Sequence, residues 1–171
     1  MALTKVNSGG INFTTGKVLQ VVSITKTDSQ SITGTTFVDV FSLAITPSAT
    51  SSKIYMTLSI NLNGSERYSA AKMYRDSTQI NMGIQVGNNR SRVSIAAQSN
   101  NDASNDTLVL HNSSTTFLDN PSTTNAVTYK VKCGNTYGGS MYTYVNRAHS
   151  MSDEAYVHIG TSTFTLMEIA G

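Results

Sequence analysis

Side chains able to do acid–base, metal or nucleophilic chemistry are few and scattered in this sequence. Its three histidines, His111, His149 and His158, are far apart and stand in no HExxH pattern or other zinc-ligand spacing. No G-x-S-x-G segment marks a nucleophilic serine, and the glycines at 138–139 lack the lysine and helix start of a phosphate-binding loop. A Ser-His-Asp triad stays open, because its members converge in space rather than along the chain. We assign no catalytic, metal-binding or cofactor-binding residue and expect no enzyme.

Carboxylates and other oxygen ligands give two further alternatives. A pair of carboxylates can hydrolyse a glycoside, but Asp153 and Glu154 are neighbours in a polar stretch, which is typical of solvated loop charges. Residues 100–106 hold three Asn and two Asp without the terminal Glu of an EF-hand, so we favour a plain polar loop over a calcium site. The single Cys133 allows no intrachain disulfide and is expected to be a buried, small apolar residue.

Composition excludes several classes of partner. Charged residues make up only 13% of the 171 residues, against about 25% in an average domain. The net charge is +2 and no Lys or Arg run occurs, so we expect no nucleic-acid partner. No apolar stretch approaches the roughly 20 residues of a membrane-spanning helix, so we expect no membrane insertion. The first residues lack the apolar region of a signal peptide, which predicts synthesis in a cytoplasm.

Alternation of apolar and polar residues predicts an all-β fold. From Lys53 to Leu62 every second residue is apolar, and Val127 to Cys133 repeats the pattern, as a strand with one face in the core requires. Further strands are predicted at 17–27, 36–46, 70–76, 91–98, 107–111, 115–119, 141–146, 155–159 and 162–170. About ten short strands separated by Gly, Asn, Ser or Pro favour a sandwich, jelly roll or barrel, and no window fits an amphipathic helix. We expect one such domain at 17–171 after a separate arm at 1–16.

The last predicted strand carries apolar residues on both faces. Phe164 and Leu166 share one face, while Met167 and Ile169 lie on the other. Because a sandwich covers only one face of a strand, a second cover is needed. We expect a neighbouring subunit there, with a loop of the same chain as the alternative. The candidate subunit interface consists of Thr163, Thr165, Met167 and Ile169.

Two other groups of residues are candidates for contacts with partners. In the arm, Ile11 and Phe13 form a small apolar anchor between glycine-rich and threonine-rich segments, with terminal disorder as the alternative. Four loops, at 65–69, 87–92, 99–106 and 135–140, are rich in residue types that combine adaptable hydrogen bonding with aromatic contact area. The candidate contact residues are Arg67, Tyr68, Asn88, Asn89, Arg90 and Tyr137; the alternative for any one loop is plain solvation.

The order of several short segments along the chain is distinctive. They lie at 16–22, 33–40, 45–48, 51–54, 118–121, 128–131, 146–147 and 165–169, and include GKVLQVV, TGTTFVDV, ITPS, LDNP and TLMEI. This order resembles a family of bacteriophage virion proteins, common in marine phages and cyanophages, that occur as tail-fibre ends or small separate structural proteins. The resemblance implies a jelly roll of the complement and tumour-necrosis-factor type, a homotrimer, and no catalytic residues.

The same resemblance implies a place in the virion and contact with other virion proteins. Many relatives have a long fibre shaft before this domain, and the arm at 1–16 is too short for one. We therefore expect a short fibre or knob that contacts a host-surface glycan or protein. Capsid decoration, a tail adaptor without adhesion, and a lectin-like glycan-binding module are the alternatives.

Overall fold

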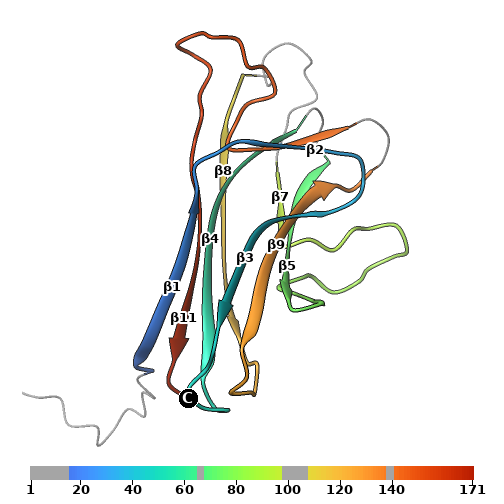
Figure 1. Ribbon diagram of the computed structural model, residues 1–171. Coiled ribbons are helices and arrows are strands. Elements are labelled where there is room, and N and C mark those ends of the chain that lie inside the picture. The colour runs from blue at the N-terminus through green and yellow to red at the C-terminus, as the bar shows by residue number, and fades with distance from the viewer. Residues whose placement is uncertain (1–15, 65–67, 98–107, 138–140) are drawn as a thin grey trace, which may run out of the picture.

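The protein is built from two antiparallel β-sheets packed against each other (Figure 1). The computed structural model describes residues 16–64, 68–97, 108–137 and 141–171. The described residues contain eleven strands and no helix, which confirms the all-β prediction. They therefore also contain no helix that is long and apolar enough to cross a membrane.

The first sheet has six strands, and β4 lies at its centre. β11 lies between β1 and β4, and β8 pairs with the other side of β4. Beyond the end of β11, the last residues of β4 pair with β10, which pairs in turn with β2. The strands are β1 (Val18–Lys26), β2 (Gln30–Thr33), β4 (Lys53–Gly64), β8 (His111–Asp119), β10 (Tyr142–Val145) and β11 (Ser162–Ile169).

The second sheet has five strands in the order β3-β9-β5-β6, and β7 also pairs with β5. It consists of β3 (Val38–Ile45), β5 (Ser69–Arg75), β6 (Thr78–Ile80), β7 (Ile95–Ala96) and β9 (Val127–Asn135). The core lies between the two sheets, because alternate residues of the facing strands are buried. Among its largest buried side chains are Ile54, Met56, Leu58 and Leu166 from the first sheet and Phe41, Met73, Tyr129 and Val131 from the second. Cys133 is fully buried in this core, as expected, and burial raises the pKa of its thiol.

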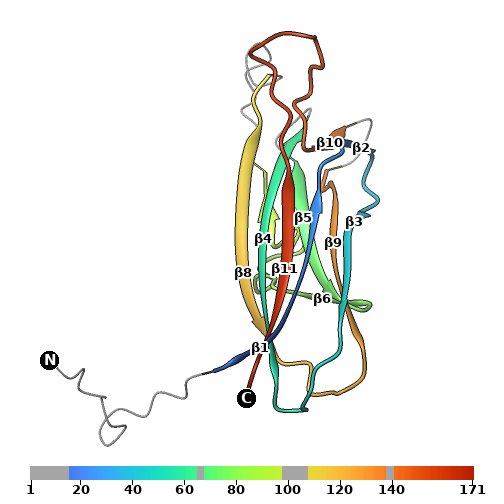
Figure 2. The ribbon, with the colours of Figure 1, turned by 60° about the vertical axis from the view of Figure 1, so that its left-hand side comes forward.

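The register of the strands defines two opposite ends of the molecule. Val18, Ile169 and Lys53 lie side by side at one end, next to residue 16 and the C-terminus (Figure 2). Gly64 and Tyr142 lie at the other end, where β4 and β10 pair. The length of β4 therefore separates residue 16 and the C-terminus from the end of the molecule where β4 and β10 pair.

Several predicted strands differ from the observed ones. In the described part of the strand predicted at 91–98, which ends at residue 97, Ile95 and Ala96 form β7, and Ser94 and Ala97 on either side donate backbone hydrogen bonds to β5. The residues before Ser94 fold back as a loop. The strand predicted at 155–159 is absent: Ile159 makes a single bridge to Arg147, and His158 is exposed. Of the segment predicted at 107–111, residues 108–110 are not in a strand and His111 is the first residue of β8, which continues through the segment predicted at 115–119.

Candidate functional site

The described part of the chain holds no cluster suited to metal binding. No group of three or more His, Cys, Asp or Glu side chains among residues 16–64, 68–97, 108–137 and 141–171 is placed to hold an ion. The candidate calcium loop at 100–106 lies outside the described residues. Asp153 and Glu154 are both exposed, as expected for solvated loop charges.

Among the residues that the structure describes, two carboxylates are buried, and the hydrogen bonds of each hold the fold together. Glu168 is 1% exposed and accepts hydrogen bonds from the Ser48 backbone N–H (2.7 Å), the Ser48 hydroxyl (2.6 Å) and the Gln20 amide (2.7 Å). Burial alone would raise the pKa of Glu168, but the hydrogen-bonding groups of Ser48, Ser52 and Gln20 around the carboxylate lower it to about 2. The carboxylate thus fixes the turn between β3 and β4 against β1 and β11.

Asp119 joins the two sheets through a second polar contact. Arg75 of β5 donates to both oxygens of Asp119 of β8, at 3.0 and 2.9 Å. The hydroxyl of Tyr129 in β9 donates to the same carboxylate at 2.7 Å, and burial and the Asp119 charge both raise the pKa of that hydroxyl. Glu168 and Asp119 lie on either side of Ile54 in the sheet, each saturated by its own partners. Their arrangement is that of structural groups rather than a hydrolytic pair.

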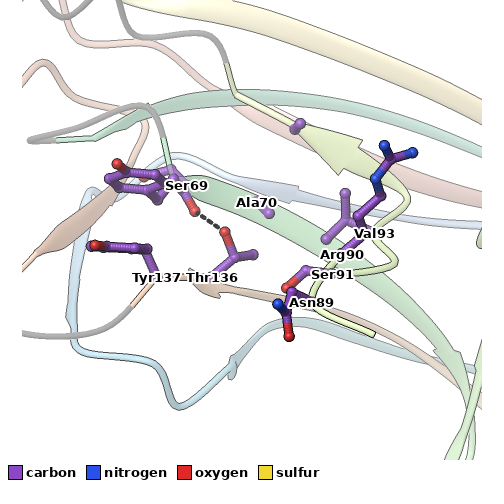
Figure 3. A pocket seen from close by; sticks show the side chains of 10 residues that line it. Ser69, Ala70, Asn89, Arg90, Ser91, Val93, Thr136 and Tyr137 are labelled. Carbon is purple, nitrogen blue, oxygen red and sulfur yellow. Dashed lines mark hydrogen bonds between the residues drawn. The ribbon is translucent and has the colours of Figure 1, made fainter. Parts of the chain in front are cut away.

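An open pocket of about 470 Å³ lies at the end of the molecule opposite residue 16. It is formed where β5 begins, β9 ends and β7 lies beside β5. Figure 3 shows Tyr137 at one end of the pocket, the Arg90 guanidinium at the other, and Ala70 between them. Its described lining is Tyr68, Ser69, Ala70, Asn89, Arg90, Ser91, Val93, Ala96, Thr136 and Tyr137.

The tyrosine side of this pocket follows from the pairing of β5 with β9. Ser69 pairs with Asn135, so the residues just outside both strand ends are neighbours. The backbone N–H and the hydroxyl of Thr136 both donate to the Tyr68 carbonyl, at 3.0 and 3.1 Å. Tyr137 donates its N–H to the Asn135 side chain at 2.7 Å, which closes a tight turn. The rings of Tyr68 and Tyr137 are consequently stacked, with centroids 4.5 Å apart.

The opposite side is a loop, residues 81–94, held in one shape by glutamine side chains. Gln85 donates to the carbonyls of Gly87 (2.6 Å) and Arg90 (3.3 Å) across the tip of the loop. Gln79 donates to the carbonyl of Arg92 at 2.9 Å. Gly87 has a φ of 73°, a left-handed conformation that glycine adopts without strain. The pocket is therefore formed without a ligand, which lowers the entropic cost of binding.

The structure brings together four of the six contact residues predicted from the loops. Tyr68, Asn89, Arg90 and Tyr137 line the pocket, although they come from three separate segments. Asn88 is exposed beside the pocket and does not line it. Arg67 lies outside the described residues, as do Ile11 and Phe13 of the predicted anchor. Ser69, Ser91 and Thr136 also line the pocket and lie in the predicted contact loops, although they were not named as contact residues. Sequence reasoning missed Ala70, Val93 and Ala96, whose position depends on strand register.

The predicted interface residues of β11 lie on the outer face of the first sheet. Thr163, Thr165, Met167 and Ile169 alternate with buried residues and are all partly exposed. β11 is an interior strand of its sheet, so strands rather than solvent lie on both of its sides. The predicted contact of β11 with a neighbouring subunit or a loop would therefore be made by the outer face of the sheet and not by a sheet edge.

Neighbouring strands extend this outer face in rows of matching side chains. Val21, Met167, Tyr55 and Leu118 form one row, and the next two rows consist of Ser and Thr. Their members are Ser23, Thr165, Thr57 and Thr116, then Thr25, Thr163, Ser59 and Ser114. None of these side chains is charged, and Val21 and Leu118 are 53% and 50% exposed. Hydroxyl pairs within the rows bond each other, as in Ser23–Thr165 at 2.7 Å.

No protein-family model matches this chain, and no curated protein matches its sequence.

Proposed function

We propose that the chain is a non-enzymatic structural protein of a phage virion, a homotrimeric knob or short fibre whose far end contacts the host surface. Its strand order supports a jelly-roll topology. Counting the principal strands β1, β3, β4, β5, β6, β8, β9 and β11 in chain order, one sheet runs first-last-third-sixth and the other second-seventh-fourth-fifth. Two interlocked Greek keys give this order, and jelly rolls are common in viral structural proteins.

The observation that carries the proposal is the uncharged part of the outer face of the first sheet, the three rows from Val21 to Thr25, which Lys53 borders at the end near residue 16. The three uncharged rows span five residues, or about 17 Å, so four strands spaced about 4.8 Å apart give roughly 330 Å² of projected area and supply only part of an interface. An ordinary stable interface covers roughly 800 Å² per partner. A sheet face of this size without charge is unusual for a surface exposed to water, where charged residues normally prevent association. We assign a second copy of the chain as the partner that binds this uncharged face.

A different apolar patch favours a ring over a two-fold dimer. In the loop that follows β6, Met82, Ile84 and Val86 are 39%, 91% and 58% exposed. These residues lie in the loop that connects β6 and β7, two strands of the second sheet, and not on the uncharged face of the first sheet. Two unlike patches on one chain suit a head-to-tail contact, which closes into a ring when every subunit uses both. We therefore assign the patch of one subunit to the uncharged face of the next.

The opposite ends of the molecule suit the two contacts of a short fibre. Residue 16 and the C-terminus lie at one end, and the tyrosine-lined pocket lies at the other. An arm at 1–16 that docks on the particle thus leaves the pocket on the part of the molecule that is farther from the particle. This polarity favours adhesion over a purely architectural role.

Substitutions on the two patches test the trimer. Met167→Lys places a charge in the apolar row of the uncharged face, and Ile84→Asp places one in the loop after β6. Both positions are on the surface, so folding is retained. We expect each variant to be monomeric by light scattering with an unchanged circular dichroism spectrum. Ile159→Asp, at a residue that is 65% exposed outside both patches, is the control and stays trimeric. Unchanged mass for both patch variants contradicts this interface.

The place in the particle is tested separately, with a tagged chain and a low-resolution map of purified virions. Tag density at the tail supports the knob or short fibre. Density at capsid symmetry axes contradicts it and indicates capsid decoration. A chain absent from virions that binds glycans in solution indicates a lectin-like module instead.

A further inference from the structure

We propose that the end pocket binds a saccharide that carries a carboxylate, such as a uronic acid. The inference deepens the proposed contact with the host surface and rests on it for its biological setting. The chemistry itself depends only on the pocket-lining residues, whatever the oligomeric state.

The two tyrosines provide an apolar face for a sugar ring. Tyr68 and Tyr137 stack on each other at 4.5 Å, and Tyr137 remains 70% exposed. Stacking and the bond of Tyr137 to Asn135 fix the ring, so a ligand does not have to order it. The C–H groups on one side of a pyranose fit such a flat aromatic surface, while both phenol hydroxyls can bond the ring substituents.

Arg90 provides a cation without a partner. Its side chain makes no ion pair or hydrogen bond with any residue that the structure describes, and the described lining of the pocket contains no Asp or Glu. A guanidinium binds a carboxylate through two parallel hydrogen bonds. One arginine suits one carboxylate, whereas a polyanion such as nucleic acid needs clustered positive charge.

Neutral polar groups complete the site between these two ends. The side chains of Asn89 and Ser91 make no hydrogen bond to the described residues, so both are open to ligand hydroxyls. Figure 3 shows Asn89 and Ser91 beside the space that separates Tyr137 from Arg90. The volume of about 470 Å³ falls within the roughly 300–1,000 Å³ of small-ligand pockets. A peptide would need a long free strand edge or a deep apolar groove, and the lining offers only Ala70, Val93 and Ala96 as aliphatic residues.

A matched pair of sugars tests the inference on the full chain. Methyl β-glucuronide and methyl β-glucoside differ only in a carboxylate against a CH2OH group, and millimolar titrations followed by NMR give both dissociation constants. We expect the glucuronide to bind at least about tenfold more tightly, because charge-assisted bonds are stronger than neutral ones. Arg90→Gln is expected to abolish that preference, and Tyr137→Ala to weaken both sugars. Arg92→Gln and Tyr156→Ala, at positions outside the pocket lining, are the controls and leave binding unchanged.

Each outcome separates this inference from the proposed function. Equal affinity for the two sugars, or a preference that survives Arg90→Gln, overturns the assignment of the carboxylate. A trimer that binds neither sugar overturns the saccharide site and leaves the structural role standing. A monomer that binds the glucuronide through Arg90 supports the site and contradicts the trimer.

Discussion

Replacing Glu168 by glutamine removes a buried negative charge while keeping the shape of the side chain. The carboxylate accepts three hydrogen bonds of 2.6–2.7 Å, from the Ser48 N–H and hydroxyl and from the Gln20 amide. A glutamine has only one acceptor oxygen, so its NH2 group must face one of the donors that now bind the carboxylate, either Ser48 or the Gln20 amide. Gln20 cannot turn its amide to compensate without losing its bond to the Thr46 carbonyl. The variant therefore loses both charge and complementary bonding.

The size of the loss follows from the pKa of the carboxyl group. A fall from 4.5 to about 2 on folding, at about 1.4 kcal/mol per pH unit, sets an upper bound of roughly 3.5 kcal/mol at neutral pH. Because the folded-state pKa is the lower one, this stability is fully present above pH 4.5. It is lost as the pH falls from 4.5 towards 2. We expect Glu168→Gln to unfold more easily by about 1–3 kcal/mol at pH 7.

Urea unfolding followed by circular dichroism measures this difference, at one protein concentration because assembly adds stability. The gap between native protein and variant should be constant from pH 7 to 5 and close towards pH 2. Glu154→Gln, at an exposed glutamate, is the control and should change stability by less than about 0.5 kcal/mol. A variant as stable as the native protein at pH 7, or a gap that does not shrink in acid, refutes this account of Glu168.

Two further predictions concern buried polar groups. Tyr129→Phe removes the hydroxyl that donates to Asp119 at 2.7 Å and should cost about 1–2 kcal/mol in urea unfolding, with the exposed Tyr156→Phe unchanged. Asn146 has a φ of 61°, and its amide donates to the carbonyls of Lys26 (2.8 Å) and Asp28 (3.0 Å). Asn146→Gly keeps that backbone shape without the bonds and should lose about 1–3 kcal/mol; Asn146→Ala should lose more, because alanine disfavours a positive φ. Equal stability of the glycine and native proteins would show that these bonds contribute nothing.

The long strands were predictable because each has one face in the core. β4 and β9 show this as strict alternation of apolar and polar residues. The short strands β2 and β6 were missed, because four and three residues carry too little pattern and form only beside a neighbour. The segment at 155–159 alternates like a strand, yet apart from the single bridge at Ile159 it pairs with nothing. Pairing is a tertiary property that local pattern does not contain.

The residue types of the candidate site were predictable, and their convergence was not. Tyr, Asn and Arg in polar loops indicate contact surfaces from their chemistry alone. That Tyr68 and Tyr137 stack depends on the register between Ser69 and Asn135, which the sequence does not specify. The uncharged outer face likewise spans four strands that are distant in sequence, so the sequence predicted only the residues that β11 contributes to it.

The mass of the native protein in solution tests the central proposal most directly. Light scattering of the full chain over a hundredfold dilution should give about three times 18.3 kDa, unchanged at the lowest concentration. That result supports a trimeric virion component, and the loss of the trimer in Met167→Lys would assign the contact to the uncharged face. A mass of 18.3 kDa at every concentration would contradict the trimer and leave that face without the partner assigned to it.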